Sequence, residues 1–173
     1  MTDDLSYCHI DSPIGRLLLA GTADALHFLS FPAGPRAFGP RPGWVPDDAP
    51  FATARRQLDA YFAGRLRRFD LALHLGGTPF RRLHWQYLAT IPHGQTRSYA
   101  QVAAALGRPN AARAVGAANG ANPLPIILPC HRVLGADGTL TGFGGGMATK
   151  AWLLRHECAM GAGSGAPTPQ GAD

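Results

Sequence analysis

The sequence of 173 residues is long enough for one ordinary domain or two small ones, and its 46% of hydrophobic residues can form a core, which excludes a peptide scaffold. No apolar run approaches the roughly 20 residues of a membrane span, and Asp3 and Asp4 remove the positively charged start of a secretory signal. We therefore expect a soluble, cytoplasmic protein with no membrane contact.

The positive charge is concentrated in one part of the sequence. Lysine and arginine total 16 against 11 acids, for a net charge of +5, and arginines but no carboxylate fall between Asp70 and Asp137. Arginine suits phosphate recognition and stacking on bases, so this segment favours a polyanionic partner. An arginine-rich genome explains the composition equally well.

Three short apolar runs open the chain, at 8–10, 17–20 and 25–31, and turn residues separate them. This pattern predicts a meander of strands. Segment 32–50 is rich in proline and glycine and has no period, so it is predicted to be a loop.

The rest of the first half predicts one helix and one strand. Apolar residues recur at helical spacing over 51–63, and apolar and polar residues alternate over 69–75. Together with the meander, these elements predict a small α/β domain over residues 1–76.

A linker and a helix start mark the second half. Gly76-Gly77 is the linker, Thr78 is a candidate N-cap, and Pro79 suits the first helical turn. A second domain is therefore expected over residues 77–158.

Two short helices joined by a tight turn are predicted within this domain. Ser98 and Gln101 have the form of a capping box, Gly107 can end that helix, and the next helix spans 111–119. The pattern indicates a helix-turn-helix, with an ordinary helical hairpin as the alternative. The second helix carries small residues around Arg113, so it can approach another surface closely.

Cys130 is the candidate nucleophile on local chemistry. The apolar run 126–128 predicts a buried strand, after which Pro129 turns the chain and places the sulfur at a pocket mouth, near backbone N–H groups that stabilise a thiolate. His131 is a candidate base, and Glu157, the only glutamate, is a candidate to orient it. A buried, unreactive cysteine is the alternative.

The segment from Asn122 through Pro-Cys-His-Arg-Val at 129–133 resembles the active-site signature of the O6-alkylguanine-DNA alkyltransferases, also called methylated-DNA–protein-cysteine methyltransferases. The resemblance extends from Phe80 to Glu157, and more weakly into the N-terminal half. It implies an α/β (α+β) fold: a ribonuclease H-like N-terminal domain of strands and helix, and a mainly helical C-terminal domain with a winged-helix-like helix-turn-helix.

The resemblance also implies catalytic roles. Cys130 matches the acceptor, which takes the alkyl group in one displacement and is consumed. His131 matches the base that deprotonates it through a water, and Glu157 matches the carboxylate that holds the histidine. Asn122 matches the side chain that organises the turn around the thiol, and Tyr99 the hydroxyl that bonds the extruded guanine and helps to donate a proton.

DNA contacts follow from the same resemblance. Arg113 matches the arginine that fills the gap after base flipping, with the small face of its helix in the minor groove. Arg97 and Arg132 are candidates for phosphate contact, with a structural role as the alternative for Arg132. The remaining expected DNA contacts are Tyr99, Ala111, Ala112, Ala114, Gly116 and Ala117. The expected substrate pocket is formed by Val133, Phe143, Gly144 and Gly145, where glycines let backbone N–H groups approach O6.

The function so implied is DNA repair by stoichiometric alkyl transfer from O6-alkylguanine in double-stranded DNA, with O4-alkylthymine as a further candidate substrate. The protein is expected to act as a monomer without a cofactor. Two alternatives are a non-enzymatic, alkyltransferase-like reader of alkylated DNA, in which another residue replaces the cysteine, and a cysteine hydrolase.

Some positions depart from the family pattern. Gly144 stands where some members have serine, Phe143 replaces the commoner tyrosine, and His84 replaces an aliphatic residue at what we expect to be a partly exposed helix position.

The remaining cysteines and the tail carry no expected chemistry. Cys8 and Cys158 are expected to be ordinary thiols. Cys8, His9 and His27 do not make a four-ligand set, so no metal site is predicted. Residues 159–173 are small and polar and are expected to be a disordered tail.

Overall fold

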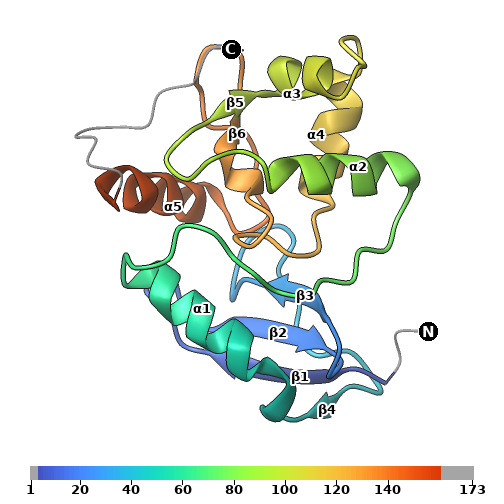
Figure 1. Cartoon of the computed structure of the whole chain (residues 1–173), viewed down its shortest axis with the longest axis vertical. Coiled ribbons are helices and arrows are strands. Elements are labelled where there is room, and N and C mark those ends of the chain that lie inside the picture. Colours follow the sequence, from blue (N-terminus) through green and yellow to red (C-terminus); the bar gives the residue numbers. More distant parts are fainter. Residues whose placement is uncertain (1–3, 161–173) are drawn as a thin grey trace.

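The structure is a computed structural model that describes residues 4–160. Figure 1 shows a sheet and one helix in the lower half, and the remaining helices in the upper half. The predicted meander is confirmed: β1 (Ser6–Ile10), β2 (Leu17–Gly21) and β3 (Leu26–Ser30) pair antiparallel, in the sheet order β3-β2-β1-β4. Helix α1 (Ala52–Phe62), also predicted, buries Ala54, Leu58 and Tyr61.

Strand β2 is buried on both faces because its alternate side chains enter different cores. Leu17 and Leu19 join the main core, and Leu18 and Ala20 join a small cluster with Trp44. The period of two in a strand accounts for this division.

The expected loop over 32–50 has more structure than its composition suggests. It holds β4 (Val45–Pro46), which pairs parallel with β1, and the 3₁₀ turn η1 (Ala49–Phe51). Trp44 is buried against Phe28, and the Arg41 guanidinium lies over both rings. Aromatic packing anchors a segment that has no hydrophobic period.

The predicted strand over 69–75 is wrong. Leu73 forms a single parallel bridge to Leu26, and no ladder continues from it. Leu71, Leu73 and Leu75 nevertheless pack against the core. The alternation of apolar and polar residues therefore reflects the burial of one face of an extended segment and not strand pairing.

The capping signals of the second half are confirmed. Thr78 accepts a hydrogen bond from the Arg81 amide at the start of α2 (Pro79–Leu88), and Ser98 and Gln101 form the capping box of α3 (Tyr99–Ala105). Gly107 has φ +74° just beyond α3, in the left-handed region that glycine adopts readily.

Helices α3 and α4 (Ala112–Gly120) pack against each other, as a helix-turn-helix requires. The short strand β5 (Arg97–Ser98) pairs parallel with β6 (Val133–Leu134). The 3₁₀ turn η2 (Cys130–Arg132) lies directly before β6, and the last helix is α5 (Met147–Met160). The expected tail therefore starts inside α5, and 161–173 lie outside the described residues.

The predicted strand over 126–128 is also wrong, because this buried segment is a turn. Ile126 has φ +74°, and the Leu128 amide donates to the Leu124 carbonyl. The Asn122 side chain holds the turn: its Nδ2 donates to the Leu128 carbonyl at 2.8 Å, and its Oδ1 accepts from the Leu124 amide at 2.9 Å. A short apolar run does not distinguish a buried strand from a buried turn.

Within residues 4–160, no helix has the length and apolar character needed to cross a bilayer.

Candidate active site

Cys130 is the first residue of η2 and is only 4% exposed. It lines a cavity of about 40 Å³ whose other walls come from both halves of the chain, including Phe31, Asn122 and Phe143. The expected position of the sulfur at a pocket is therefore confirmed.

The expected backbone N–H contacts are present, but burial outweighs them. Burial raises the pKa of Cys130 to about 11, although a hydrogen bond from Asn122, the positive charge of Lys150 and the backbone N–H groups of Cys130 and His131 act in the opposite direction. The backbone N–H of Cys130 also donates to the Leu128 carbonyl at 2.7 Å. The resting group at neutral pH is a thiol, and a base has to remove its proton before it can attack.

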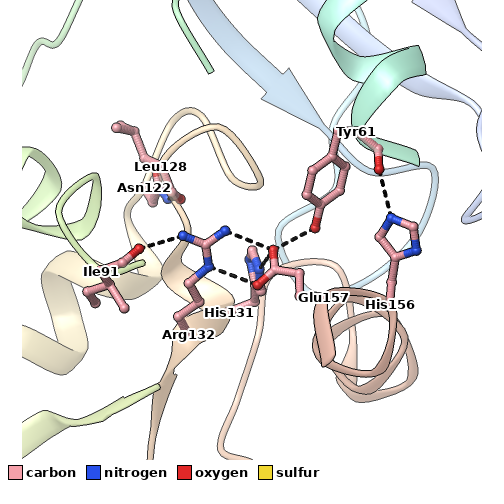
Figure 2. A network of polar contacts seen from close by, with 8 residues as sticks. All are labelled: Tyr61, Ile91, Asn122, Leu128, His131, Arg132, His156 and Glu157. Atoms are coloured by element: carbon pink, nitrogen blue, oxygen red, sulfur yellow. Dashed lines mark hydrogen bonds and ion pairs between the residues drawn. The ribbon is translucent and has the colours of Figure 1, made fainter. Parts of the chain in front are cut away.

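His131, the candidate base, is held by a buried hydrogen bond. His131 Nε2 lies 2.7 Å from Oε2 of Glu157, which approaches from α5 (Figure 2). Burial lowers the pKa of His131, and this outweighs the opposite effect of Glu157. Burial alone would raise the pKa of Glu157, but His131 and Arg132 hold it well below its ordinary value. The pair is therefore a neutral histidine that donates from Nε2 to a carboxylate, and Nδ1 is left as the proton acceptor.

Arg132 supports this carboxylate from the other side. Its Nε donates to Glu157 Oε1 at 2.8 Å and its Nη2 to Oε2 at 3.0 Å, while Nη1 donates to the Ile91 carbonyl at 2.6 Å (Figure 2). The side chain is buried. The expectation of a phosphate contact is wrong for Arg132, and the structural alternative is confirmed.

Tyr61 and His156 are site residues that the sequence did not reveal. The Tyr61 hydroxyl, on α1, donates to Glu157 Oε2 at 2.7 Å, and the His156 ring bonds the Tyr61 carbonyl through Nε2 at 2.8 Å. Figure 2 shows both contacts joining α1 to α5. No local signal pointed to Tyr61, since its partner is 96 residues away in the chain.

Lys150, the only lysine, is also buried at the site. Its Nζ donates to the Val133 carbonyl at 2.8 Å, and burial lowers its pKa to about 8. Val133 is itself buried in β6.

Of the expected pocket residues, Phe143 and Gly144 line the cavity beside Cys130, whereas Val133 and Gly145 are not among its walls. The Phe143 ring packs on Phe31 with centroids 5.4 Å apart, and a Cβ on Gly145 would lie 2.6 Å from that same ring. The Gly144 carbonyl accepts the Arg36 amide at 3.1 Å. The loop over 142–146 is therefore fitted closely to the segment after β3.

Tyr99 lies on the helix-turn-helix side of the site. It is half-buried, and its hydroxyl lies 2.6 Å from the Thr141 Oγ1. A Cβ on Gly116 would lie 3.9 Å from the Tyr99 ring, so α4 passes close beneath it. Arg97 is half-buried and bonds the Thr96 carbonyl at 2.9 Å.

Helix α4 presents a face of small side chains. Val115 and Ala118 point into the core, while Arg113 is exposed. On the outer face Ala114 and Ala117 are exposed, and Ala111, Ala112 and Gly116 are half-buried. A helix with such a face can approach a groove closely.

His84 is not at a partly exposed position, as we had expected, but is fully buried. Its Nε2 lies 3.1 Å from Oδ1 of Asn119 on α4. Among the described residues, no group of three or more histidine, cysteine or acidic side chains is arranged to hold a metal ion.

Comparison with known proteins shows the family of this chain. The family model of the 6-O-methylguanine DNA methyltransferase ribonuclease-like domain matches residues 5–75, and that of the DNA-binding domain matches residues 79–159. The chain belongs to the O6-methylguanine-DNA methyltransferase family. Its enzyme class is that of a methylated-DNA–protein-cysteine methyltransferase, which repairs DNA by alkyl transfer to a cysteine, and the expected family and fold class are confirmed.

Relatives of this family are similar over nearly the whole chain. A methylated-DNA–protein-cysteine methyltransferase of Mycobacterium leprae is 52% identical over 86% of this chain and 89% of its own, and one of Methanosarcina acetivorans is 46% identical over 87% and 97%. The crystal structure of Mycobacterium tuberculosis OGT in complex with DNA superposes with a TM-score of 0.85, at 50% identity over 92% of this chain and 96% of that one.

Proposed function

We propose that this protein removes the alkyl group from O6-alkylguanine in double-stranded DNA and keeps it on Cys130. The observation that carries the proposal is the buried Cys130 thiol beside a neutral His131, whose Nε2 is fixed by Glu157. Because the pKa of the thiol is raised, a positioned base is required to remove its proton at neutral pH.

The reaction is a single displacement at carbon. His131 accepts the Cys130 proton through a water, and the thiolate attacks the alkyl carbon in line with the C–O6 bond. A C–S bond forms as the C–O6 bond breaks, and the bonding electron pair moves to O6. Tyr99 helps to donate a proton to the departing guanine. The proton taken from Cys130 replaces the donated one, so that overall the thiol loses one proton and the guanine gains one.

Each molecule acts once in this proposal. The product is a thioether, and water does not displace a thiolate from an alkyl carbon at neutral pH without further activation.

Asn122 supports the reacting turn, since it holds the Leu128 carbonyl two residues before the sulfur.

Access to the site supports base flipping. Cys130 is only 4% exposed, so its sulfur cannot reach an alkyl carbon inside a stacked duplex. The nucleotide has to leave the stack, at a cost of a few kcal/mol. Arg113 is exposed on the small face of α4 and is placed to fill the gap, with Ala114 and Ala117 against the minor groove.

The proposal extends to O4-alkylthymine, whose alkyl group is also carried by an exocyclic oxygen. The proposal also takes the protein to act as a monomer. A location in the cytoplasm is part of the same proposal.

Intact mass spectrometry separates this proposal from its alternatives. The protein is incubated with a duplex that carries O6-methylguanine, and with a matched duplex that carries guanine. A mass gain of one CH₂ unit, with the first duplex only, is expected. Selective binding without a gain would favour a non-enzymatic reader, and neither binding nor gain would contradict both.

A further inference from the structure

His84 begins a chain of buried contacts that ends on the nucleophile. It lies on α2 with no exposed surface, and its Nε2 is 3.1 Å from Oδ1 of Asn119 on α4. The Nδ2 of Asn119 in turn donates to the Cys130 carbonyl at 3.2 Å. Three elements that are far apart in the sequence, α2, α4 and η2, are thus joined through polar atoms.

The direction of these hydrogen bonds follows from their ends. A backbone carbonyl only accepts, so the Asn119 amide nitrogen must face Cys130 and its oxygen must face His84. His84 therefore carries its hydrogen on Nε2 and donates it. Burial lowers the pKa of His84, which keeps the ring neutral, and its Nδ1 has no hydrogen-bond partner among the described residues. The Cys130 carbonyl and the His84 N–H thus hold the two ends of the Asn119 amide and keep it from rotating by half a turn.

The Cys130 carbonyl is a useful point to hold. It also accepts the Val133 amide, which closes η2, and the turn just before it is held by Asn122 through the Leu128 carbonyl. Asn122 and Asn119 therefore hold the Leu128 and Cys130 carbonyls, which lie before and after the sulfur-bearing carbon in the chain. Without the Asn119 bond, η2 keeps its internal closure but loses this hydrogen bond to α4.

We propose that His84 is a positioning residue for Cys130, which acts through Asn119 to fix the turn that aims the sulfur. The proposal rests on alkyl transfer to Cys130. It assigns a role to a buried histidine that the proposed reaction does not otherwise use.

A general role in helix packing is the competing explanation, and the neighbouring residue provides a matched control. Trp85 Nε1 donates to the Ala118 carbonyl at 2.8 Å, so it also joins α2 to α4 through a buried hydrogen bond. That bond involves neither the Asn119 side chain nor the Cys130 carbonyl. Trp85→Phe should lower stability without slowing transfer by protein that remains folded.

The test measures DNA affinity and the single-turnover rate of methyl transfer at saturating O6-methylguanine duplex. His84→Leu should slow transfer about tenfold, as expected for the loss of one well-placed hydrogen bond, with affinity unchanged. His84→Gln offers an amide donor at similar reach and should recover most of the rate. Asn119→Ala should be as slow as His84→Leu, and the double variant should be no slower than Asn119→Ala.

Several results would overturn the proposal: an unchanged rate in His84→Leu, an equal loss in Trp85→Phe, or losses that add in the double variant. If His84→Leu does not fold, Asn119→Ala decides alone. This variant removes the contact on which the proposal depends, so an unchanged transfer rate in it would overturn the proposal. If the unmodified protein transfers no methyl group, the proposed function has failed; if it transfers normally and the variants match it, only the role of His84 has failed.

Discussion

The hydroxyl of Tyr61 donates a 2.7 Å hydrogen bond to Oε2 of Glu157, and so ties the first helix of the N-terminal half to the carboxylate that orients His131. Both side chains are buried. The N-terminal half therefore contributes directly to the network around the base. This hydrogen bond comes from helix α1 and not from the sheet (Figure 2).

Tyr61→Phe tests this tie between the halves. The ring still fills its place, but a donor to a buried carboxylate is lost, so the free energy of unfolding should fall by about 1–3 kcal/mol. Urea unfolding measures the change. Tyr87→Phe removes a hydroxyl from a half-buried ring on α2 and should cost much less. Equal losses in the free energy of unfolding would show that the Tyr61 hydrogen bond contributes no more to stability than the Tyr87 hydroxyl.

Glu157→Gln should be more damaging, because it leaves the buried Arg132 guanidinium without its counter-charge. Breaking a buried ion pair in this way costs about 3–5 kcal/mol. Methyl transfer should also be lost, since an amide oxygen holds the His131 ring less firmly. A folded Glu157→Gln variant with unchanged transfer would contradict the role of Glu157.

The same carboxylate predicts how stability depends on pH. The pKa of Glu157 is depressed in the folded protein, so its stabilising contribution is complete above its ordinary pKa of about 4.5 and is lost as the pH falls from there through the folded value. Unfolding of the unmodified protein and of Glu157→Gln is compared across this range. Their stabilities should converge as the pH falls, and a constant difference would contradict the assignment.

Local signals made much of the fold predictable. The caps at Thr78 and Ser98 need only neighbouring residues, and the meander follows from short apolar runs between turns. Segment 126–128 shows the limit of such signals: its burial was predictable, but the Asn122 bonds that make it a turn were not. Likewise, proline and glycine in 32–50 concealed the aromatic contacts of Trp44.

The site was predictable in part for the same reason. Cys130 and His131 are adjacent in the sequence, and Glu157 stood out as the only glutamate. Tyr61 and Lys150 reach the site from distant segments, and nothing in their own neighbourhoods marks them. The raised pKa of Cys130 also depends on burial by the whole fold.

His131 predicts the pH dependence of methyl transfer. Its pKa is lowered by burial, so the neutral base should persist at and above about pH 6.5, and transfer should slow only as the pH falls below that value. His131→Ala should instead be slow and should quicken as the pH rises toward the Cys130 pKa of about 11. Stopped-flow or quenched single-turnover assays measure both profiles. Identical profiles would exclude His131 as the base.

Arg113→Ala should slow transfer from duplex DNA far more than transfer from free O6-alkylguanine, because only the duplex has a gap to fill. Arg108→Ala is the matched control, since Arg108 is an exposed arginine of the same helix-turn-helix whose guanidinium lies over Phe80. An equal loss on both substrates, or the same loss in Arg108→Ala, would contradict the flipping role of Arg113.

The most direct test of the central claim is peptide-level mass spectrometry after incubation with excess O6-methylguanine duplex. We predict one methyl group per protein molecule, located on Cys130, with no second turnover and no modification of Cys130→Ala. Methyl groups on Cys8 or Cys158, or repeated turnover that leaves Cys130 unmodified, would contradict the account.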